Sequence, residues 1–180
     1  MAGGHPAAAL ALFQANLDAA TTPEQTATTL TSIAECHKRM GELEEPLTEL
    51  RKALESLTQA HGRDHRSWQT GMIRTKIGQT LLGLSRYDEA ELHLVPGYIE
   101  LLDHLGDMSD RDRTHFIAVR NSILDLYRKT NREVAIQAWA DALIPALEQK
   151  VEQPGESSSP PARTAIESVR ALGLAYVDAG

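Results

Sequence analysis

Apolar residues recur every three or four positions through residues 77–101, and a short polar step divides them into two groups. The first group ends at Leu84 and the second begins at Tyr87. This spacing predicts two amphipathic helices joined by a tight turn. Three small residues stand where the two helices would cross at close range: Gly78, Ala90 and Gly97. We expect the rest of the chain to be organised around this helical hairpin.

The same periodicity predicts helices along most of the chain. Thr22 suits the N-cap of one of them, with Pro23 at the first helical position and Gln25 completing a capping box. Pro46 falls in a first turn, where proline is tolerated, whereas Pro96 should kink its helix. The predicted helices span residues 7–20, 23–40, 43–61, 68–84, 87–105, 116–129, 132–150 and 164–178.

Three predicted turns recur at nearly constant intervals. Gly41, Ser85 and Asn131 are separated by 44 and 46 residues, and Gly41 and Asn131 are the residue types that most readily end a helix in a left-handed conformation. The period alone would suit HEAT and armadillo repeats, which have about 40–47 residues. A second regularity is a pair of residues that precedes each turn by the same interval: Ile33-Ala34, Ile77-Gly78 and Ile123-Leu124.

This pattern of small and large residues resembles the tetratricopeptide repeat. The stretch Ser85-Arg-Tyr-Asp-Glu-Ala-Glu91, the pair Gly97-Tyr98 and the later Leu126-Tyr127 and Ala138-Trp139 are similar to the helical tails of bacterial serine/threonine protein kinases. The connector 60–65 resembles that of kinesin light chains. The resemblance covers residues 25–148. It implies an all-α, right-handed superhelical solenoid of about three antiparallel hairpins with flanking helices.

The expected domain organisation has four parts. Residues 1–21 form an N-terminal segment with a flanking helix, and residues 22–151 hold the repeats. Residues 152–162 are rich in Pro, Gly and Ser and are expected to form a flexible linker. Residues 163–180 are expected to form a terminal helix that corresponds to the first half of a further repeat.

Composition and charge argue against several other classes of protein. Apolar residues make up 42% of the chain and aromatic residues 4%, which favours helix over sheet. A net charge of -7 argues against nucleic acid as a partner. No run reaches the roughly 20 apolar residues of a membrane span, and the short apolar run in residues 1–13 has no Lys or Arg before it, unlike a secretory signal. We expect a cytoplasmic protein.

The sequence contains no recognisable catalytic, cofactor-binding or metal-binding motif. Cys36 is the only cysteine, which excludes an internal disulfide, and its neighbour His37 would point in a different direction on a helix. His61 and His65 have a metal-like spacing, but a helix break lies between them. The charged run 107–113 is expected to be a solvated loop. We therefore expect no enzymatic activity, no cofactor and no metal site.

The resemblance implies a groove lined by the first helix of each hairpin. The residues expected to line it are Thr31, Glu35, Lys38, Arg39, Thr75, Gln79, Asn121, Asp125, Arg128 and Lys129. Their hydroxyl, amide and basic groups suit an extended peptide or a partner helix with acidic character. The family's carboxylate clamp for chaperone C-termini needs Lys and Asn where Thr31 and Glu35 stand, so that mode of binding is not expected.

The favoured function is therefore a protein-protein interaction scaffold, as the regulatory part of a bacterial signalling kinase system. The alternative is a self-assembling structural element that forms a homo-oligomer without a peptide ligand. It rests on the terminal helix 164–180, which matches only half a unit and would need a cover for its apolar face. An enzyme with an unrecognised site would require a pocket lined by ionisable residues.

Overall fold

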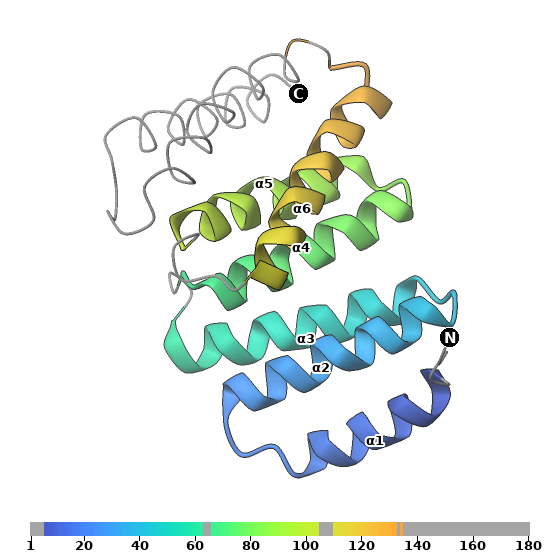
Figure 1. Ribbon diagram of the computed structural model, residues 1–180, viewed down its shortest axis with the longest axis vertical. Helices are drawn as coiled ribbons and strands as arrows, with labels where there is room; N and C mark the ends of the chain where they lie inside the picture. Colours follow the sequence, from blue (N-terminus) through green and yellow to red (C-terminus); the bar gives the residue numbers. More distant parts are fainter. Residues whose placement is uncertain (1–5, 63–65, 105–109, 133, 135–180) are drawn as a thin grey trace.

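A computed structural model describes residues 6–62, 66–104, 110–132 and 134. These residues form six helices and no strand (Figure 1): α1 Pro6–Asp18, α2 Pro23–Arg39, α3 Glu44–His61, α4 Trp68–Gly83, α5 Tyr87–Asp103 and α6 Asp110–Lys129. The all-helical architecture predicted from the sequence is thus confirmed for this part of the chain. The predicted helices 132–150 and 164–178, the linker 152–162 and the charged run 107–113 lie wholly or partly outside the described residues.

The helices pack as antiparallel neighbours in chain order. α2 pairs with α3 and α4 pairs with α5, α1 packs against α2, and α3 joins the two pairs through α4. α6 packs against both α5 and α4. Figure 1 shows the resulting stack, with α1 at one end and the α4–α5 pair with α6 toward the other. Consecutive helix pairs therefore share one continuous core, whose members include Leu47, Ile77 and Leu101.

The three predicted turns share one backbone geometry. Each has a residue with positive φ: 85° at Gly41, 60° at Ser85 and 54° at Asn131. The N–H of the next residue donates in each case to the carbonyl five positions earlier: Glu42 to His37 at 3.1 Å, Arg86 to Leu81 at 2.9 Å, and Arg132 to Tyr127 at 2.9 Å. This is the hydrogen bond of a Schellman helix end. The same helix stop therefore recurs at the interval seen in the sequence.

The turns allow a matched test of backbone strain. Ser85 holds the left-handed conformation with a side chain, whereas Gly41 holds it without one and a Cβ there would meet nothing within 4 Å. We expect Ser85→Gly to stabilise the fold by about 0.5–1 kcal/mol and Gly41→Ser to destabilise it by a similar amount. Urea unfolding of the two variants measures both changes. Equal signs for the two substitutions would contradict the assigned role of the turn.

Small residues bring α4 and α5 into close contact. A Cβ added at Gly78 would lie 2.5 Å from Cγ of Leu94, and one at Gly97 would lie 2.8 Å from Cγ2 of Thr75. Ala90 is fully buried. The predicted close crossing at these three small residues is confirmed. Gly71, which the sequence analysis did not single out, lies at the same interface, where an added Cβ would be 3.0 Å from the Gly97 carbonyl oxygen.

The two unusual prolines lie where their missing N–H is tolerated. Pro46 is in the first turn of α3, as predicted. Pro96 lies inside α5, which the structure assigns as one helix from Tyr87 to Asp103. Pro96 and Leu92, one turn before it, are both exposed, so the Leu92 carbonyl that loses its helical donor lies on the side that water can reach. The helical assignment of α5 continues through Pro96.

α6 begins at Asp110, six positions before the predicted start at Phe116. Residues 110–115 are charged or polar, so hydrophobic periodicity does not reveal their helical conformation. From Phe116 onward the helix carries apolar residues that are buried against the core. Phe116 stacks on the buried Tyr98 of α5, with ring centroids 4.4 Å apart and an interplanar angle of 12°. This aromatic pair holds the N-terminal half of α6, and with it His115, against the α4–α5 pair.

Candidate functional site

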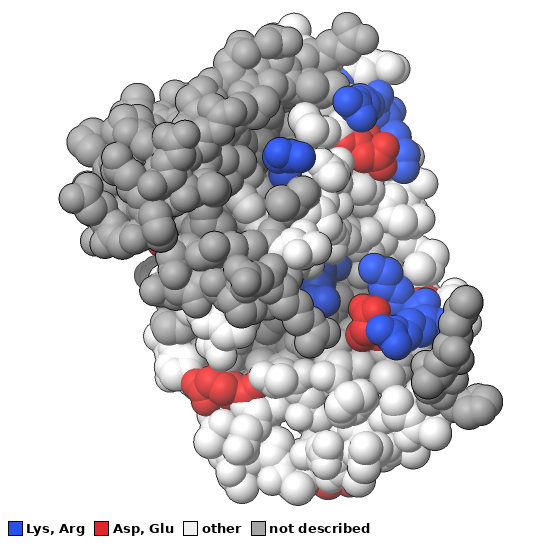
Figure 2. Space-filling view, viewed as in Figure 1, with Lys and Arg blue, Asp and Glu red and all other residues white. Residues whose placement is uncertain are grey.

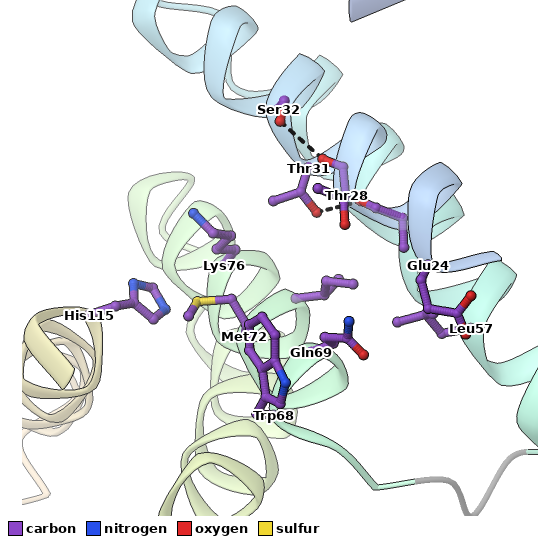
Figure 3. Close-up of a pocket in the computed structure, with 12 residues that line it drawn as sticks. Glu24, Thr28, Thr31, Ser32, Leu57, Trp68, Gln69, Met72, Lys76 and His115 are labelled. Atoms are coloured by element: carbon purple, nitrogen blue, oxygen red, sulfur yellow. Dashed lines mark hydrogen bonds between the residues drawn. The ribbon is translucent and has the colours of Figure 1, made fainter. Parts of the chain in front are cut away.

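A cavity of about 420 Å³ lies between α2 and α4. Figure 3 shows side chains of α2 and α4 on its two long sides and His115 of α6 at one end. Its apolar lining residues are Ala27, Leu57, Trp68, Met72 and Ile73. Its polar lining residues are Glu24, Thr28, Thr31, Ser32, Gln69, Lys76 and His115. A cavity of this size lies within the range of ligand pockets, about 300–1,000 Å³.

A second cavity of about 190 Å³ continues the first along the same two helices. The two share Thr31, Lys76 and His115 in their linings. The second cavity adds mainly polar groups, among them Glu35, Lys38 and Gln79. We call the two cavities together the α2–α4 groove. The second cavity forms the polar end of the groove, with Lys38 and Lys76 in its lining, whereas the first cavity, at the Trp68 end, combines apolar and polar side chains.

Helix caps fix both walls of the groove at its Trp68 end. The Thr22 hydroxyl oxygen caps α2 by accepting from the N–H of Gln25 at 3.2 Å. The capping box predicted at Thr22 is not completed, because Gln25 Oε1 accepts from the N–H of Thr21, one residue earlier, at 3.0 Å. A capping box between Ser67 and Thr70 starts α4. That cap places Trp68, which is 39% exposed, at the first helical position and at the rim of the groove.

The hydroxyl groups on the α2 wall donate to their own helix. The Thr31 Oγ1 donates to the carbonyl of Ala27 at 2.8 Å, and the Ser32 Oγ donates to that of Thr28 at 3.0 Å (Figure 3). Each hydroxyl has one hydrogen, which these bonds use. Toward a ligand, Thr31 and Ser32 therefore offer oxygen lone pairs rather than donors.

His115 is oriented by a buried hydroxyl on α4. The Thr75 Oγ1 donates to the Met72 carbonyl at 2.9 Å, and it lies 3.0 Å from Nε2 of His115. This contact is a hydrogen bond between the two side chains, in which the tautomer of His115 decides the donor. A second bond between the same helices runs from the Gln79 amide to the Ser122 hydroxyl at 3.0 Å. These two bonds hold the α6 end of the groove in place.

Both carboxylates in the groove lining face cationic or ionisable groups of the same chain. Glu24 Oε1 lies 2.6 Å from Nε2 of His61, and Glu35 Oε1 lies 3.4 Å from Nε of Arg39. A backbone hydrogen bond at the start of α2, followed by the contact with His61, lowers the pKa of Glu24 below its ordinary value. Glu24 is therefore firmly ionised at neutral pH. The groove lining thus carries both carboxylates and basic or ionisable groups, the latter at Lys38, Lys76 and His115.

Some of the residues predicted to line a groove lie together in the structure. Thr31, Glu35, Lys38 and Gln79 line its polar end. Thr75 does not reach the surface as expected, because its side chain is fully buried behind the groove wall. The remaining predicted residues do not line either cavity: Arg39, Asn121, Asp125, Arg128 and Lys129. Asp125 and Lys129 form an ion pair with each other at 3.0 Å instead.

Four further residues line the groove without having been predicted: Trp68, Gln69, Lys76 and His115. The predicted face of α4 was displaced by about one residue, because threonines that read as surface positions are buried. His115 precedes the predicted start of its helix and comes to the groove only through the packing of α6 on α4. The spacing of Gln69, Met72 and Lys76 at three and four residues is the signal that could have indicated this face.

The other candidate sites take ordinary structural roles. Cys36 is a buried free thiol, while His37 pairs with Glu42 across the helix end. His61 pairs with Glu24, and His65 lies outside the described residues. Within the described ranges, no three His, Cys, Asp or Glu side chains are grouped as metal ligands would be. None of the helices that the structure describes has both the length and the apolar character needed to cross a membrane.

Fold and groove together define an all-helical protein of packed helix pairs with an amphipathic groove between two of its helices. Comparison with protein-family models, with curated proteins and with solved structures gives no match to this chain. The likeness to tetratricopeptide proteins therefore stays a prediction from the sequence pattern.

Proposed function

We propose that the protein is a protein-protein interaction scaffold that binds a peptide segment or a partner helix in the α2–α4 groove. The observation that supports this most is the continuity of a cavity of mixed apolar and polar lining with a mostly polar one along two helices of different hairpins. A bulky apolar side chain suits the first cavity and a polar chain suits its extension. A groove of this kind can recognise both a bulky apolar side chain and a polar stretch of the same linear segment.

The charges of the groove favour an acidic partner. The basic or ionisable side chains of the lining include Lys38, Lys76 and His115, and its carboxylates Glu24 and Glu35 face His61 and Arg39. The chain as a whole carries a net charge of -7. A groove with cationic groups on an acidic protein attracts an acidic segment while the remaining surface repels it.

We further propose a tetratricopeptide-like stack as the architecture in which this groove works. The support is the identical helix stop at Gly41, Ser85 and Asn131 together with the small residues that let α4 and α5 nest. A repeated helix end and close packing of the two helices of a hairpin are both expected of the units of such a solenoid. A role in a bacterial signalling kinase system follows from the sequence resemblance alone, and identification of the partner tests it.

Reversal of the groove charges should abolish partner binding. We expect Lys38→Glu combined with Lys76→Glu to reduce retention of a partner from a native lysate at least about tenfold, because like charges then meet across the interface. The matched control is Arg128→Glu with Lys129→Glu, which makes the same charge change on α6 outside both cavities. Quantitative mass spectrometry of the retained proteins measures the effect, and circular dichroism verifies that both variants fold.

Comparison with the control variant also defines the results that would contradict the proposal. A partner lost equally in both variants would show that net charge, rather than the α2–α4 groove, governs binding. A partner lost only with the α6 pair would move the site to the end of α6. No protein retained by the wild-type chain above a bead control would overturn the scaffold proposal.

A further inference from the structure

α1 leaves an apolar helix face open at the end of the stack. It has 13 residues, of which none is buried, although most of them are Ala, Leu or Phe. Leu10, Phe13 and Leu17 are half-buried on one side of the helix. The opposite side exposes Leu12, with 63% of its surface accessible, together with the exposed Ala8, Ala11 and Ala15. A helix that is apolar on both sides ordinarily has neighbours on both sides.

The exposed face is uncharged, although 24% of the residues of the chain are charged. Its four residues carry no charge, and Asp18 is the only charged residue of α1. The first Lys or Arg of the whole chain is Lys38. In Figure 2 the part of the surface over α1, at the bottom, shows no Lys or Arg. A helix that lies on a lipid surface normally carries Lys or Arg on its polar face, so this face suits another protein surface better than an anionic membrane.

The positions on this face are related by a twofold symmetry. Ala8 and Ala15 lie equally far from the midpoint between Ala11 and Leu12, which is close to the middle of α1. An antiparallel copy of the helix therefore places Ala8 against Ala15 and Leu12 against Ala11. Each large side chain then meets a small one, as an isologous interface requires. The alanines allow the two helix axes to approach closely.

The one charged residue of the helix also fits this arrangement. Asp18 lies at the C-terminal end of α1, where the helix dipole disfavours an anion, and the first turn of α1 has no acidic residue. In an antiparallel pair the Asp18 carboxylate lies beside the N-terminal end of the partner's α1. That end carries the positive pole of the dipole and favours an anion.

We propose that α1 is a homodimerisation surface, on which a second copy of this chain packs its own α1 antiparallel about a twofold axis near Leu12. The interface is separate from the α2–α4 groove, because no residue of α1 lines either cavity. A single helix of this length buries less area than a standard interface, so the dimer is weak and forms in roughly the micromolar range or above. Dimerisation leaves both grooves accessible and makes the protein bivalent for its partner.

The test measures the mass of the full chain by analytical ultracentrifugation over roughly 1 μM to 1 mM, the range expected for a small interface. We expect the wild-type mass to rise from one chain toward two. Leu12→Glu should raise the dissociation constant at least about a hundredfold, since two carboxylates would meet near the axis. Leu92→Glu is the matched control, because Leu92 is 60% exposed on α5, and it should leave the dimer intact.

Cysteine pairs test the direction of packing. A mixture of the Ala8→Cys and Ala15→Cys proteins should form a disulfide-linked dimer faster than either protein alone. Faster self-linkage of the Ala8→Cys protein would overturn the antiparallel arrangement. A wild-type chain that stays monomeric throughout, or a dimer unaffected by Leu12→Glu, would overturn the surface itself. Binding of monomeric wild-type chain to phosphatidylcholine vesicles, lost in Leu12→Glu, would replace the second copy with a lipid surface.

Discussion

Gly78→Ala is expected to destabilise the protein by about 2–3 kcal/mol, even though alanine is the better helix former by about 1 kcal/mol. The added methyl group would lie 2.5 Å from Cγ of Leu94 and 2.9 Å from its backbone nitrogen. The leucine side chain can rotate away, but the backbone of α5 cannot. The two helices must therefore separate, and a melting temperature lower by about 5–10 °C should follow for a chain of this size.

Gly83→Ala is the matched control for this prediction. Gly83 lies in the same helix, has no positive φ, and an added Cβ there would meet nothing within 4 Å. The same substitution should therefore stabilise the protein by about 0.5–1 kcal/mol through helix propensity alone. Thermal unfolding followed by circular dichroism compares the two variants. A loss at Gly78 no larger than the change at Gly83 would show that α4 and α5 are not in close contact there.

The features that the sequence predicts best are those that admit few residue types. A left-handed helix stop selects Gly or Asn, and the apolar phase restarts after it, so Gly41 and Asn131 are recognisable as turns. A close helix crossing excludes large side chains, so Gly78 and Gly97 stand out among leucines. These constraints are local and steric, and the structure confirms them at the expected positions.

The orientation of α4 could not be predicted in the same way, because this helix is surrounded by protein. Thr70, Thr75 and Thr80 are all buried, although threonine reads as a surface residue. Their hydroxyls are satisfied within the fold: Thr75 donates to the Met72 carbonyl and Thr80 to the Lys76 carbonyl, each at 2.9 Å. Because α4 has no clear polar side, the sequence does not show which of its residues face the groove.

The groove itself depends on contacts between distant segments. Thr31 and Lys38 come from α2, Lys76 and Gln79 come from α4, and His115 comes from α6. The sequence predicts the α2 contribution, because α2 has one apolar and one polar face. It does not predict how α6 packs across α4, because that packing depends on the Tyr98–Phe116 stack and on hydrogen bonds between α4 and α6.

A buried carboxylate between α4 and α5 leads to the second large prediction. Glu100 is 5% exposed, and its Oε2 accepts a hydrogen bond from the Thr70 hydroxyl at 2.9 Å. Its Oε1 lies 3.1 Å from Nε of Arg74, although the N–H does not point at the oxygen as in a hydrogen bond. Burial raises the pKa of Glu100, while Arg74 opposes this change. Arg66 also lowers the pKa and Asp103 raises it.

Arg74→Met is expected to cost about 3–5 kcal/mol at pH 8, because it leaves a buried carboxylate without its cation. The direction of the pH effect follows from the pKa of Glu100, which lies above its unfolded value of 4.5. Ionised Glu100 weakens the fold above its folded pKa, and this penalty disappears as the pH falls through that pKa toward 4.5. In Arg74→Met the pKa rises further, so the variant should regain more stability between pH 8 and pH 5 than the wild-type protein does.

The double variant Arg74→Met with Glu100→Gln separates this effect from that of a neighbouring histidine. Burial, and then Arg74 and Arg51, lower the pKa of His93, while Glu89 opposes them, so removal of Arg74 alters the titration of His93 as well. Gln keeps an oxygen for Thr70 but carries no charge, and replacing both ions of a buried pair costs little. The double variant should therefore recover most of the stability lost at pH 8, and the difference in pH dependence between the single and the double variant from pH 8 to pH 5 belongs to Glu100. If urea unfolding instead shows the double variant as unstable as Arg74→Met alone, the arginine stabilises α4 through its packing on α5 rather than through the charge of Glu100.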